Sequence, residues 1–461
     1  MSLWTAAELA AATGGTASGD FTVTGVTFDS REVEPSFLFV ALTGEATDGH
    51  RFLDQAVERG AAAVLVSQPT PHPHVLVADT FAALEDLARA ARARTSATVI
   101  GVTGSVGKTG TKEALAAALD RGEPGRTHKS VKSYNNHTGV PLSLARMPRD
   151  SRYAVLEMGM NHAGELAHLT TLVRPHVAVV TAIAPAHTAF FVDEAAIADA
   201  KGEIFAGLQS GGTAIVPFDS PHRDRLIAAA APHAARTVTF GSDPAADVHP
   251  LDTMRTERGT FVTAALGERT LSYTLAFPGA HWVSNSLAVL AAVDAAGGEL
   301  ALAGLALADL AELPGRGRRL RVVVGDGHAT VIDESYNANP ASMRATLAVL
   351  AEEPGRHVAV LGEMRELGDD TAAYHAALAA PIAAANVETV VLVGEAMRPL
   401  ADTLDPAIET VHVADAAAAR EALAGMLRPG DAVLIKGSNG VGLSAVVASL
   451  SKGAGLTKDA V

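Results

Sequence analysis

The chain has 461 residues, 48% of them hydrophobic, and its 36 basic and 51 acidic side chains give a formal net charge of −15. This length predicts about three domains, each large enough to bury a core of its own. The acidic balance argues against nucleic acid or an anionic membrane as the main partner. The chain has no cysteine, which excludes disulfides, thiolate metal sites and cysteine nucleophiles.

The first part of the chain, residues 1–93, is expected to form a small α/β domain. Its opening segment, Met1–Gly15, carries Glu8 and no basic leader, which indicates an amphipathic helix rather than a signal peptide. Two later segments, Asp29-Ser30-Arg31 and Asp48-Gly49-His50, are ordinary turn sequences when taken alone. Short apolar runs between these features predict strands at Phe21–Phe28, Phe37–Ala41, Ala62–Val66 and Val75–Val77.

The middle part, residues 94–315, is organised around a glycine-rich stretch. The apolar run Thr98–Thr103 predicts a buried strand, and an alanine-rich helical pattern follows the glycines. Gly104 and Gly107 allow backbone N–H groups to turn toward a polyphosphate at the positive end of the new helix. The spacing departs from the general P-loop pattern, which has a glycine at the position of Val102.

A loop of this kind predicts a nucleotide site. Lys108 would reach the β- and γ-phosphates, and the hydroxyl of Thr109 would be offered to Mg²⁺. The alternative, a glycine-rich surface turn with an exposed lysine, is disfavoured by the strand before the loop and the helix after it. The residues expected to contact the nucleotide here are Gly104, Ser105, Val106, Gly107, Lys108 and Thr109.

Three further candidates lie at or after strand ends of the middle part, where ligands of parallel sheets gather. Glu157 ends the apolar run from Tyr153, and a carboxylate there is costly unless it is paired or binds a cation. His187 follows the run His176–Thr181, although a lone loop histidine is more often solvated. Lys201 lies in a helical pattern and is either solvent-facing or, beside Mg²⁺, a repelled ammonium whose charge must change.

The rest of the middle part contains polar and alanine-rich segments. The region 218–275 has short strand-like runs and predicts a small β-rich excursion. Asn285 has the donor and acceptor pair needed to read an adenine edge, but it could equally start a helix. The apolar region Leu287–Leu313 contains too many charges for a membrane span. Beyond it, four arginines within residues 316–321 indicate a nearby anion.

The last part, residues 316–461, shows a second alternation of strand and helix patterns. It predicts another open α/β sheet, with functional residues at the carboxyl ends of its strands. The segment Asp333–Pro340, DESYNANP, lies at one such end, and Lys436-Gly437-Ser438 lies at another.

Taken together, these segments resemble the Mur ligases, the ATP-dependent amide-bond enzymes that build the peptidoglycan stem peptide. The resemblance covers nearly the whole chain, and the order of the motifs is more specific than any one of them. The motifs are GVTGSVGKT at 101–109, NNHTGVP at 135–141, EMG at 157–159, APAH at 184–187, AKGEI at 200–204, His281 with Asn285, and Pro314-Gly315-Arg316.

Within this family the last part resembles the branch that joins D-alanyl-D-alanine to UDP-N-acetylmuramoyl tripeptide. The resemblance rests on Asp333–Pro340, on GEMRELG at 362–368 with His375, and on Lys436-Gly437-Ser438. The branch that adds the third residue typically has an Asp-Asn-Pro-Arg signature, which this chain lacks. The chain also departs from the family at Asn439 and Ser444, where an arginine and a glutamate are usual, so these positions inherit no role.

The resemblance implies three domains: residues 1–93 for the UDP-muramyl peptide, 94–315 with the P-loop for ATP, and a Rossmann-like ligase domain over 316–461. It further implies Mg²⁺, an acyl-phosphate intermediate and, in several members, a carbamate formed from CO₂ on the lysine that matches Lys201. The implied catalytic residues are Lys108, Lys201, His187 and Arg316, and the implied metal ligands are Thr109, Glu157, His187 and carbamylated Lys201. Further ATP contacts would be His281, Asn285, Arg316, Asp333 and Asn337, and substrate contacts Asp29, Ser30, Arg31, Asp48, Gly49, His50, Asn135, Asn136 and Tyr336.

Two other interpretations stay open at this point. One keeps the fold but changes the substrate, as in a folylpolyglutamate-synthase-like ligase or a ligase that adds the third residue. The other is a P-loop nucleotide switch, which would have no need for Glu157, His187 and Lys201. In either case we expect a cytoplasmic protein, monomeric, without a membrane span and without a nucleic-acid partner.

Overall fold

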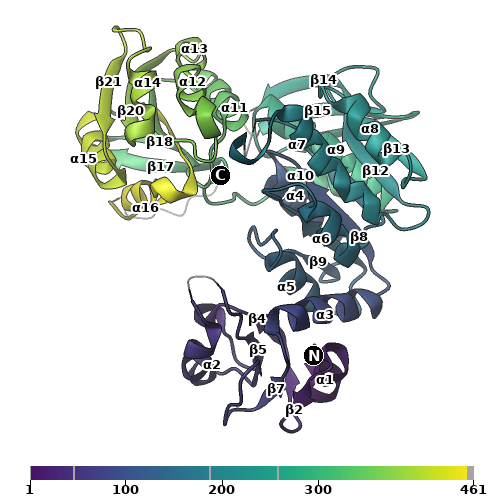
Figure 1. The fold of residues 1–461 in the computed structure, drawn as a ribbon. Coiled ribbons are helices and arrows are strands. Elements are labelled where there is room, and N and C mark those ends of the chain that lie inside the picture. The colour runs from purple at the N-terminus through teal and green to yellow at the C-terminus, as the bar shows by residue number, and fades with distance from the viewer. Residues whose placement is uncertain (1, 45–46, 186–187, 257–258, 454–461) are drawn as a thin grey trace.

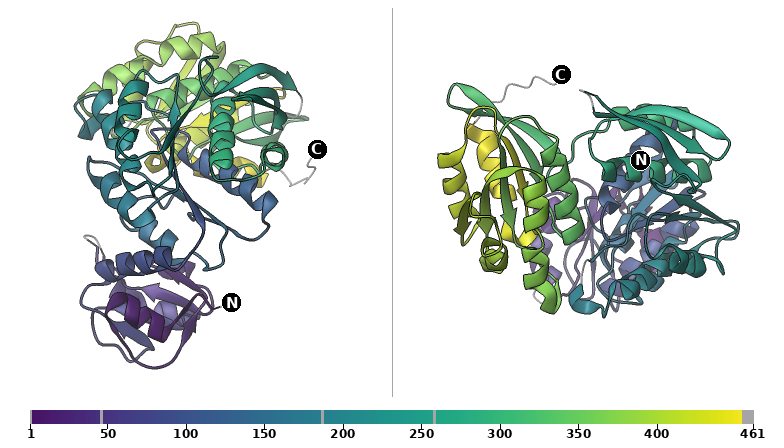
Figure 2. Two further views of the ribbon diagram at one scale, coloured as in Figure 1. Left: turned by 90° about the vertical axis from the view of Figure 1, so that its right-hand side faces the viewer. Right: turned by 90° about the horizontal axis from the view of Figure 1, so that it is seen from above.

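The computed structural model describes residues 2–44, 47–185, 188–256 and 259–453 (Figure 1). Within these residues the chain forms three main β-sheets, which have five, nine and six strands in chain order. It also forms one two-stranded sheet. The N-terminal part lies at the bottom of Figure 1, the central part at the right and the C-terminal part at the upper left. The expected three-domain α/β architecture is confirmed, and Figure 2 shows the central and C-terminal parts facing one another.

The N-terminal sheet has the order β2-β7-β6-β5-β4 and is parallel except for β2. The opening helix forms as expected, because Thr5 and Glu8 make a capping box at its start. The single strand expected at Phe21–Phe28 is wrong, because β3 pairs with β1 while β4 joins the main sheet. The elements are β1 (Trp4–Thr5), α1 (Ala6–Thr13), β2 (Thr16–Ala17), β3 (Thr22–Val23), β4 (Gly25–Thr27), β5 (Phe37–Val40), α2 (Leu53–Glu58), β6 (Ala63–Val66), β7 (His74–Leu76) and α3 (Thr80–Ala93).

The central sheet has the order β16-β15-β14-β13-β12-β11-β8-β10-β9. Its strands are parallel from β9 to β14, and β14, β15 and β16 form an antiparallel meander. The β-rich region after residue 218 is therefore a continuation of this sheet rather than a separate excursion. The strands are β8 (Thr98–Thr103), β9 (Thr127–Lys129), β10 (Tyr153–Glu157), β11 (Val177–Val180), β12 (Thr213–Pro217), β13 (Arg236–Phe240), β14 (Val248–Thr256), β15 (Gly259–Leu266) and β16 (Arg269–Leu275).

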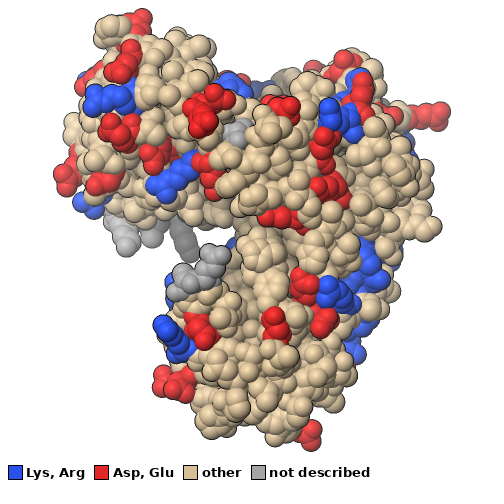
Figure 3. Space-filling view, in the orientation of Figure 1, with Lys and Arg blue, Asp and Glu red and all other residues tan. Residues whose placement is uncertain are grey.

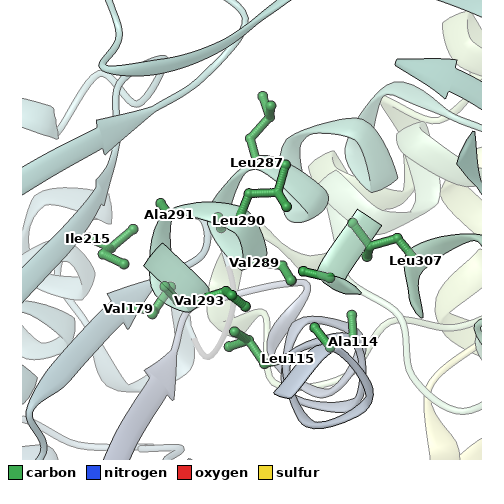
Figure 4. Packing of buried hydrophobic residues seen from close by; sticks show 14 of the residues in the cluster. Ala114, Leu115, Val179, Ile215, Leu287, Val289, Leu290, Ala291, Val293 and Leu307 are labelled. Atoms are coloured by element: carbon green, nitrogen blue, oxygen red, sulfur yellow. The ribbon is translucent and has the colours of Figure 1, made fainter. Parts of the chain in front are cut away.

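Helices cover both faces of the central sheet. Ile100 and Val102 of β8 pack in one hydrophobic cluster with α4, α9 and α10, while Val99 packs in another with α5, α6 and α7. This alternation follows from the two-residue period of a strand that is buried on both faces. Figure 4 shows the first cluster, where Leu115 meets Val293. The helices are α4 (Lys108–Gly122), α5 (Gly139–Ala145), α6 (Glu165–Val173), α7 (Glu194–Gly202), α8 (Arg223–Ala230), α9 (Ala280–Ala295) and α10 (Leu300–Ala308).

The C-terminal sheet has the order β17-β18-β22-β19-β20-β21, and only the β17–β18 pair is antiparallel. Asn339 caps α11 and Pro340 takes its first position, as the Asn-Pro sequence favours. No described helix is long and apolar enough to cross a membrane. The elements are β17 (Arg318–Val324), β18 (Gly327–Glu334), α11 (Pro340–Ala351), β19 (His357–Gly362), α12 (Thr371–Ala376), α13 (Ala379–Ala384), β20 (Val387–Val393), α14 (Arg398–Ala401), β21 (Glu409–Val413), α15 (Ala416–Met426), β22 (Ala432–Lys436) and α16 (Ser444–Gly453).

Candidate active site

The glycine-rich loop lies at the point where the central sheet changes direction. β8 stands between β10 and β11: the chain passes from β8 to β9 and β10 on one side, and then crosses to β11 and β12 on the other side. Ligands of open α/β sheets bind at such a switch point, beyond the carboxyl ends of the strands. Both glycines are required there. A Cβ on Gly104 would lie 2.0 Å from Thr181 Oγ1, and Gly107 has a φ of +84° that favours glycine.

Lys108, Thr109 and Glu157 meet at this end of the sheet. Lys108 Nζ donates to the carbonyl of Gly104 at 2.6 Å, and Thr109 Oγ1 donates to Glu157 Oε2 at 2.9 Å. Asn135 Nδ2 donates to Glu157 Oε1 at 2.7 Å, so the buried carboxylate is held by neutral donors on both oxygens. Burial lowers the pKa of the Lys108 ammonium, and the negative charge of Glu157 partly opposes this shift.

A cavity of about 430 Å³ opens from the loop toward the C-terminal part. The side chain of Arg316 lines this cavity. Its guanidinium carbon lies 4.0 Å from the centre of the Tyr336 ring, and its Nη2 donates to Ser133 Oγ at 3.1 Å. Helix α11 forms the opposite wall, at the junction of the two parts in Figure 1. Of the predicted ATP and substrate residues, the cavity brings together Ser105, Val106, Gly107, Lys108, Thr109, His281, Asn285, Arg316 and Asn337 with Asn135 and Tyr336.

Helix α9 supplies the two residues expected near adenine. Asn285 lies directly against the loop, because a Cβ on Gly107 would be 2.8 Å from Asn285 Oδ1. His281 lies one turn earlier and also lines the cavity. Burial lowers the pKa of the His281 imidazole to about 4, so the ring is neutral at physiological pH.

The C-terminal wall contains a buried ion pair that the sequence did not indicate. Glu334 and Lys436 are partners in the parallel register of β18 and β22, and Lys436 Nζ lies 3.3 Å from Glu334 Oε2. Lys436 Nζ also donates to the carbonyl of Asn337 at 2.9 Å. Burial raises the pKa of the Glu334 carboxyl, and the nearby ammonium of Lys436 opposes that shift.

Asp333 is placed differently from its neighbour. It is buried, and it accepts from the backbone N–H of Gly315 at 2.9 Å and from Ser335 Oγ at 2.6 Å. Glu334 lines the cavity, whereas Asp333 is absent from its lining. Asp333 therefore holds the turn that presents Arg316, and its expected contact with the nucleotide stays a prediction.

Lys201 is buried in α7, with 1% of its surface exposed. Within the described residues, its ammonium has no ion pair or hydrogen bond. Burial lowers the pKa of this ammonium well below its ordinary value, and the positive charge of Lys108 contributes to the shift. The solvent-facing alternative for Lys201 is therefore wrong. His187 lies outside the described residues.

The two candidate substrate turns of the N-terminal part both contact α2. Asp29 pairs with Arg31 at 2.7 Å, and Ser30 Oγ donates to Gln55 of that helix. His50 Nδ1 donates to Asp48 Oδ1 at 2.7 Å, while its Nε2 accepts from a backbone N–H. The turn at Gly49 is tight, because a Cβ there would lie 2.8 Å from the backbone of the strand end.

Asn136 and three of the four arginines in residues 316–321 do not line this cavity. Asn136 precedes α5, and its Oδ1 accepts from Thr138 and from the backbone N–H of Gly139, the first residue of that helix. It does not line the cavity, and its expected contact with the substrate stays a prediction. The four arginines make different contacts. Arg316 alone among them lines the cavity, whereas Arg318 pairs with Asp333 and Arg319 pairs with Glu353.

Sequence reasoning also missed Lys112, one helical turn after Lys108. Its side chain is fully buried, and its Nζ donates to the carbonyls of Ser130 at 3.0 Å and Lys132 at 2.6 Å. It also pairs with Glu113 at 2.8 Å and lies 4.0 Å from Glu157. The available signal was the position of a lysine on the buried side of an alanine-rich helix.

The chemistry of this arrangement is that of an anion site next to a carboxylate. Cationic groups approach the cavity from the central part through Lys108 and from the C-terminal part through Arg316 and Lys436. A protein of net charge −15 thus concentrates positive charge where a polyphosphate would lie. Among the described residues, no group of three or more His, Asp or Glu side chains could hold a metal by itself.

Comparison with known proteins agrees with this geometry. Residues 102–293 match the Mur ligase middle domain, residues 318–439 the Mur ligase glutamate ligase domain, and residues 22–98 the Mur ligase family catalytic domain. The UDP-N-acetylmuramoyl-tripeptide--D-alanyl-D-alanine ligase of Escherichia coli is 38% identical over 82% of each chain. The enzyme of the same name from Bacillus subtilis is 35% identical over 92% of this chain and 93% of its own length.

Solved structures give the same result. MurF from Acinetobacter baumannii superimposes with a TM-score of 0.85 at 30% identity, covering 97% of this chain and 99% of its own. MurF ligase from Thermotoga maritima, solved in complex with ADP, gives a TM-score of 0.77 at 27% identity, covering 94% and 98%. The agreement extends over all three parts of the molecule. The chain belongs to the Mur ligase family.

Proposed function

We propose that this protein is an ATP-dependent ligase that joins D-alanyl-D-alanine to UDP-N-acetylmuramoyl tripeptide in peptidoglycan precursor synthesis. The observation that carries the proposal is the single cavity at which Lys108, Glu157 and Arg316 come together from two parts of the chain. Relatives with this activity in their names align over more than four fifths of both chains. ATP is the nucleotide that we assign to the cavity.

The reaction needs activation of a carboxylate, which is a poor electrophile. A carboxylate oxygen of the tripeptide attacks the γ-phosphorus of ATP, ADP leaves, and an acyl phosphate forms. The amine of the dipeptide, after losing a proton, attacks the acyl carbon, and phosphate leaves with the electrons of the C–O bond. We assign Lys108 to the β- and γ-phosphates. We assign Arg316 to the negative charge that develops on the opposite side of the transferred phosphoryl group.

Two elements of the cavity suit the nucleoside end. Neutral His281 and Asn285 are placed on one helix to contact adenine, and Glu334 is the cavity-lining carboxylate on the C-terminal wall. Because the cavity is shared between the central and C-terminal parts, a change in their separation would open or complete it. Closed, it would keep water away from the acyl phosphate, whose hydrolysis is the competing reaction.

The residues present fit Mg²⁺. Thr109 and Glu157 offer oxygen atoms, and Mg²⁺ prefers oxygen ligands while keeping several waters and phosphate oxygens. Bound there, the ion would neutralise charge that develops on the phosphates. We further assign His187 to a second Mg²⁺ by family resemblance.

Lys201 is the residue that we propose to carry a carbamate. Its buried ammonium has a lowered pKa, which favours the neutral amine that reacts with CO₂. The N–C bond forms with release of a proton, and the product is an anion compatible with a metal. Bicarbonate-dependent activity that disappears in Lys201→Ala would support this modification.

The UDP-muramyl peptide is assigned to the N-terminal part, at Asp29-Ser30-Arg31 and Asp48-Gly49-His50. Figure 3 shows a gap between the N-terminal and C-terminal parts on the face drawn, and we propose that the substrate extends along this side toward the cavity. Asn135 and Tyr336 would meet its peptide end. We place the reaction in the cytoplasm, where ATP and UDP-linked precursors are available, and propose a monomer without nucleic-acid or membrane partners.

The proposal is tested by coupled ADP release with Mg²⁺ and ATP, using several acceptors and several amine donors. Turnover should require both UDP-N-acetylmuramoyl tripeptide and D-alanyl-D-alanine. Equal turnover with a single amino acid would favour a ligase for another substrate. Nucleotide binding without any ADP release in the presence of both peptides would favour a nucleotide switch.

A further inference from the structure

One short segment touches all three parts of the molecule. The bridging loop, Ser130–Asn135, follows β9 and runs beside the phosphate site. It is defined by its contacts: Lys132 and Tyr134 reach the N-terminal part, Asn135 reaches Glu157, and Ser133 reaches the C-terminal Arg316.

The contact with the N-terminal part is made at a substrate turn. Glu32 ends the short helix Ser30–Glu32, directly after the residues that we assign to the UDP-muramyl peptide. Its carboxylate pairs with Lys132 Nζ and accepts from Tyr134 Oη at 2.9 Å. A ligand that shifts this turn therefore acts on two side chains of the bridging loop.

The contact with the phosphate site is equally direct. Ser133 Oγ lies 3.3 Å from Thr109 Oγ1 and accepts from Arg316 Nη2 at 3.1 Å. Two residues later, Asn135 Nδ2 donates to Glu157. The hydroxyl of one loop residue thus links the P-loop helix to the C-terminal arginine.

The backbone between these contacts is fixed. The buried ammonium of Lys112 holds the carbonyls of Ser130 and Lys132. Lys132 has a φ of +52°, a left-handed conformation that is unfavourable for residues other than glycine. A lysine therefore occupies a position where glycine would be easier to accommodate, and its side chain pairs with Glu32.

We propose that the bridging loop couples binding at the N-terminal substrate turn to nucleotide binding at the phosphate site, with Lys132 as the positioning residue that transmits it. This inference rests on the proposed function, because it takes the UDP-muramyl peptide as the ligand of the turn. The contacts are contiguous from Glu32 through Lys132 and Ser133 to Thr109. Coupling between two sites is a measurable ratio of affinities, and each ligand must change the affinity of the other by the same factor.

The test is calorimetric titration with Mg²⁺ and a non-hydrolysable ATP analogue, in the absence and presence of saturating UDP-N-acetylmuramoyl tripeptide. The two dissociation constants give a coupling ratio for each variant. Lys132→Gly removes the ammonium at a position whose φ of +52° glycine adopts without strain. For a partly exposed ion pair we expect the ratio to move about two- to fivefold toward one. Glu32→Gln should have the same effect, and the double variant no more than either single variant.

The matched control is Arg149→Ala. Arg149 pairs with Glu8, so this variant also removes an ion pair between the N-terminal and central parts, but away from the phosphate site. Its coupling ratio should equal that of the unaltered protein. A ratio of one in the unaltered protein, an unchanged ratio in Lys132→Gly, or an equal loss in Arg149→Ala would overturn the proposal.

Failure of the proposed function is recognised separately. Formation of the UDP-muramyl pentapeptide by the unaltered protein is measured in the same preparation. If product forms but the ratio is one, the coupling alone is wrong. If no product forms, the proposed function is wrong, and the ratio still decides the coupling.

Discussion

Replacement of Lys112 by methionine tests the buried network behind the phosphate site. Lys112→Met keeps most of the side-chain volume but removes an ammonium that satisfies two backbone carbonyls and faces Glu113 and Glu157. Each carbonyl left without a donor costs about 1–3 kcal/mol. Breaking a buried ion pair by removing one partner costs about 3–5 kcal/mol. Both costs arise from removal of the same ammonium and are therefore not additive. We expect the free energy of unfolding to fall by about 3–5 kcal/mol in total.

A matched control is available on the same carboxylate. Lys129 also pairs with Glu113, but its side chain is about half exposed. Lys129→Met makes the same chemical change at the surface, where an ion pair contributes about 0–1 kcal/mol. The comparison therefore isolates the effect of burial.

The assay is urea unfolding followed by tryptophan fluorescence in a Trp4→Phe background. The chain has two tryptophans, and the remaining Trp282 packs against α4 at Gly110. With an m-value of about 2–3 kcal/mol/M, Lys112→Met should lower the urea midpoint by about 1–2 M. A loss no larger than that of Lys129→Met would refute the reasoning.

Three further predictions concern the loop, the arginine and pH. Gly107→Ala places a Cβ at positive φ and against Asn285. It should weaken ATP binding in calorimetry by about fivefold or more, and unchanged affinity would contradict the requirement for glycine. Arg316→Ala should lower kcat more than it weakens ATP binding, whereas equal losses would contradict its role in completing the site. Burial lowers the pKa of His128 to about 4 in the folded chain, below the ordinary 6.5 of the unfolded chain. The unfolded state therefore takes up the proton first, and stability should fall as pH drops from 6.5 to 4. His128→Gln should reduce the dependence of the urea midpoint on pH between 6.5 and 4. An unchanged slope of midpoint against pH would contradict this role of His128.

The parts of the site that follow strand ends could be predicted from the sequence. Apolar runs located β8 and β10, and parallel strands bring their carboxyl ends to one edge of the sheet. Thr109 follows β8 and Glu157 ends β10, so the sequence predicts both residues at that edge, where the structure brings them into contact.

Other features depend on information that a local pattern lacks. Asp333 and Glu334 are adjacent acidic residues on β18, and their side chains point to opposite faces of the sheet. Which of the two lines the cavity depends on which face of β18 is turned toward it. Lys112 donates hydrogen bonds to carbonyls 18 and 20 residues away, so the residues next to it in sequence do not indicate its partners. The strand-like runs expected in region 218–275 are Thr237–Phe240, Thr260–Leu266 and Thr270–Leu275, and they do not include β14. The residues Leu251–Arg255 of β14 are exposed and do not alternate as those of a half-buried strand do.

The most direct test of the central claim follows an oxygen atom. UDP-N-acetylmuramoyl tripeptide labelled with ¹⁸O in its terminal carboxylate is incubated with ATP, Mg²⁺ and D-alanyl-D-alanine, and the released phosphate is analysed by mass spectrometry. An acyl-phosphate route transfers one carboxylate oxygen to phosphate in each turnover, so we predict labelled phosphate in equal amount to the pentapeptide product. Pentapeptide formed together with unlabelled phosphate, or no pentapeptide at all, would contradict the account.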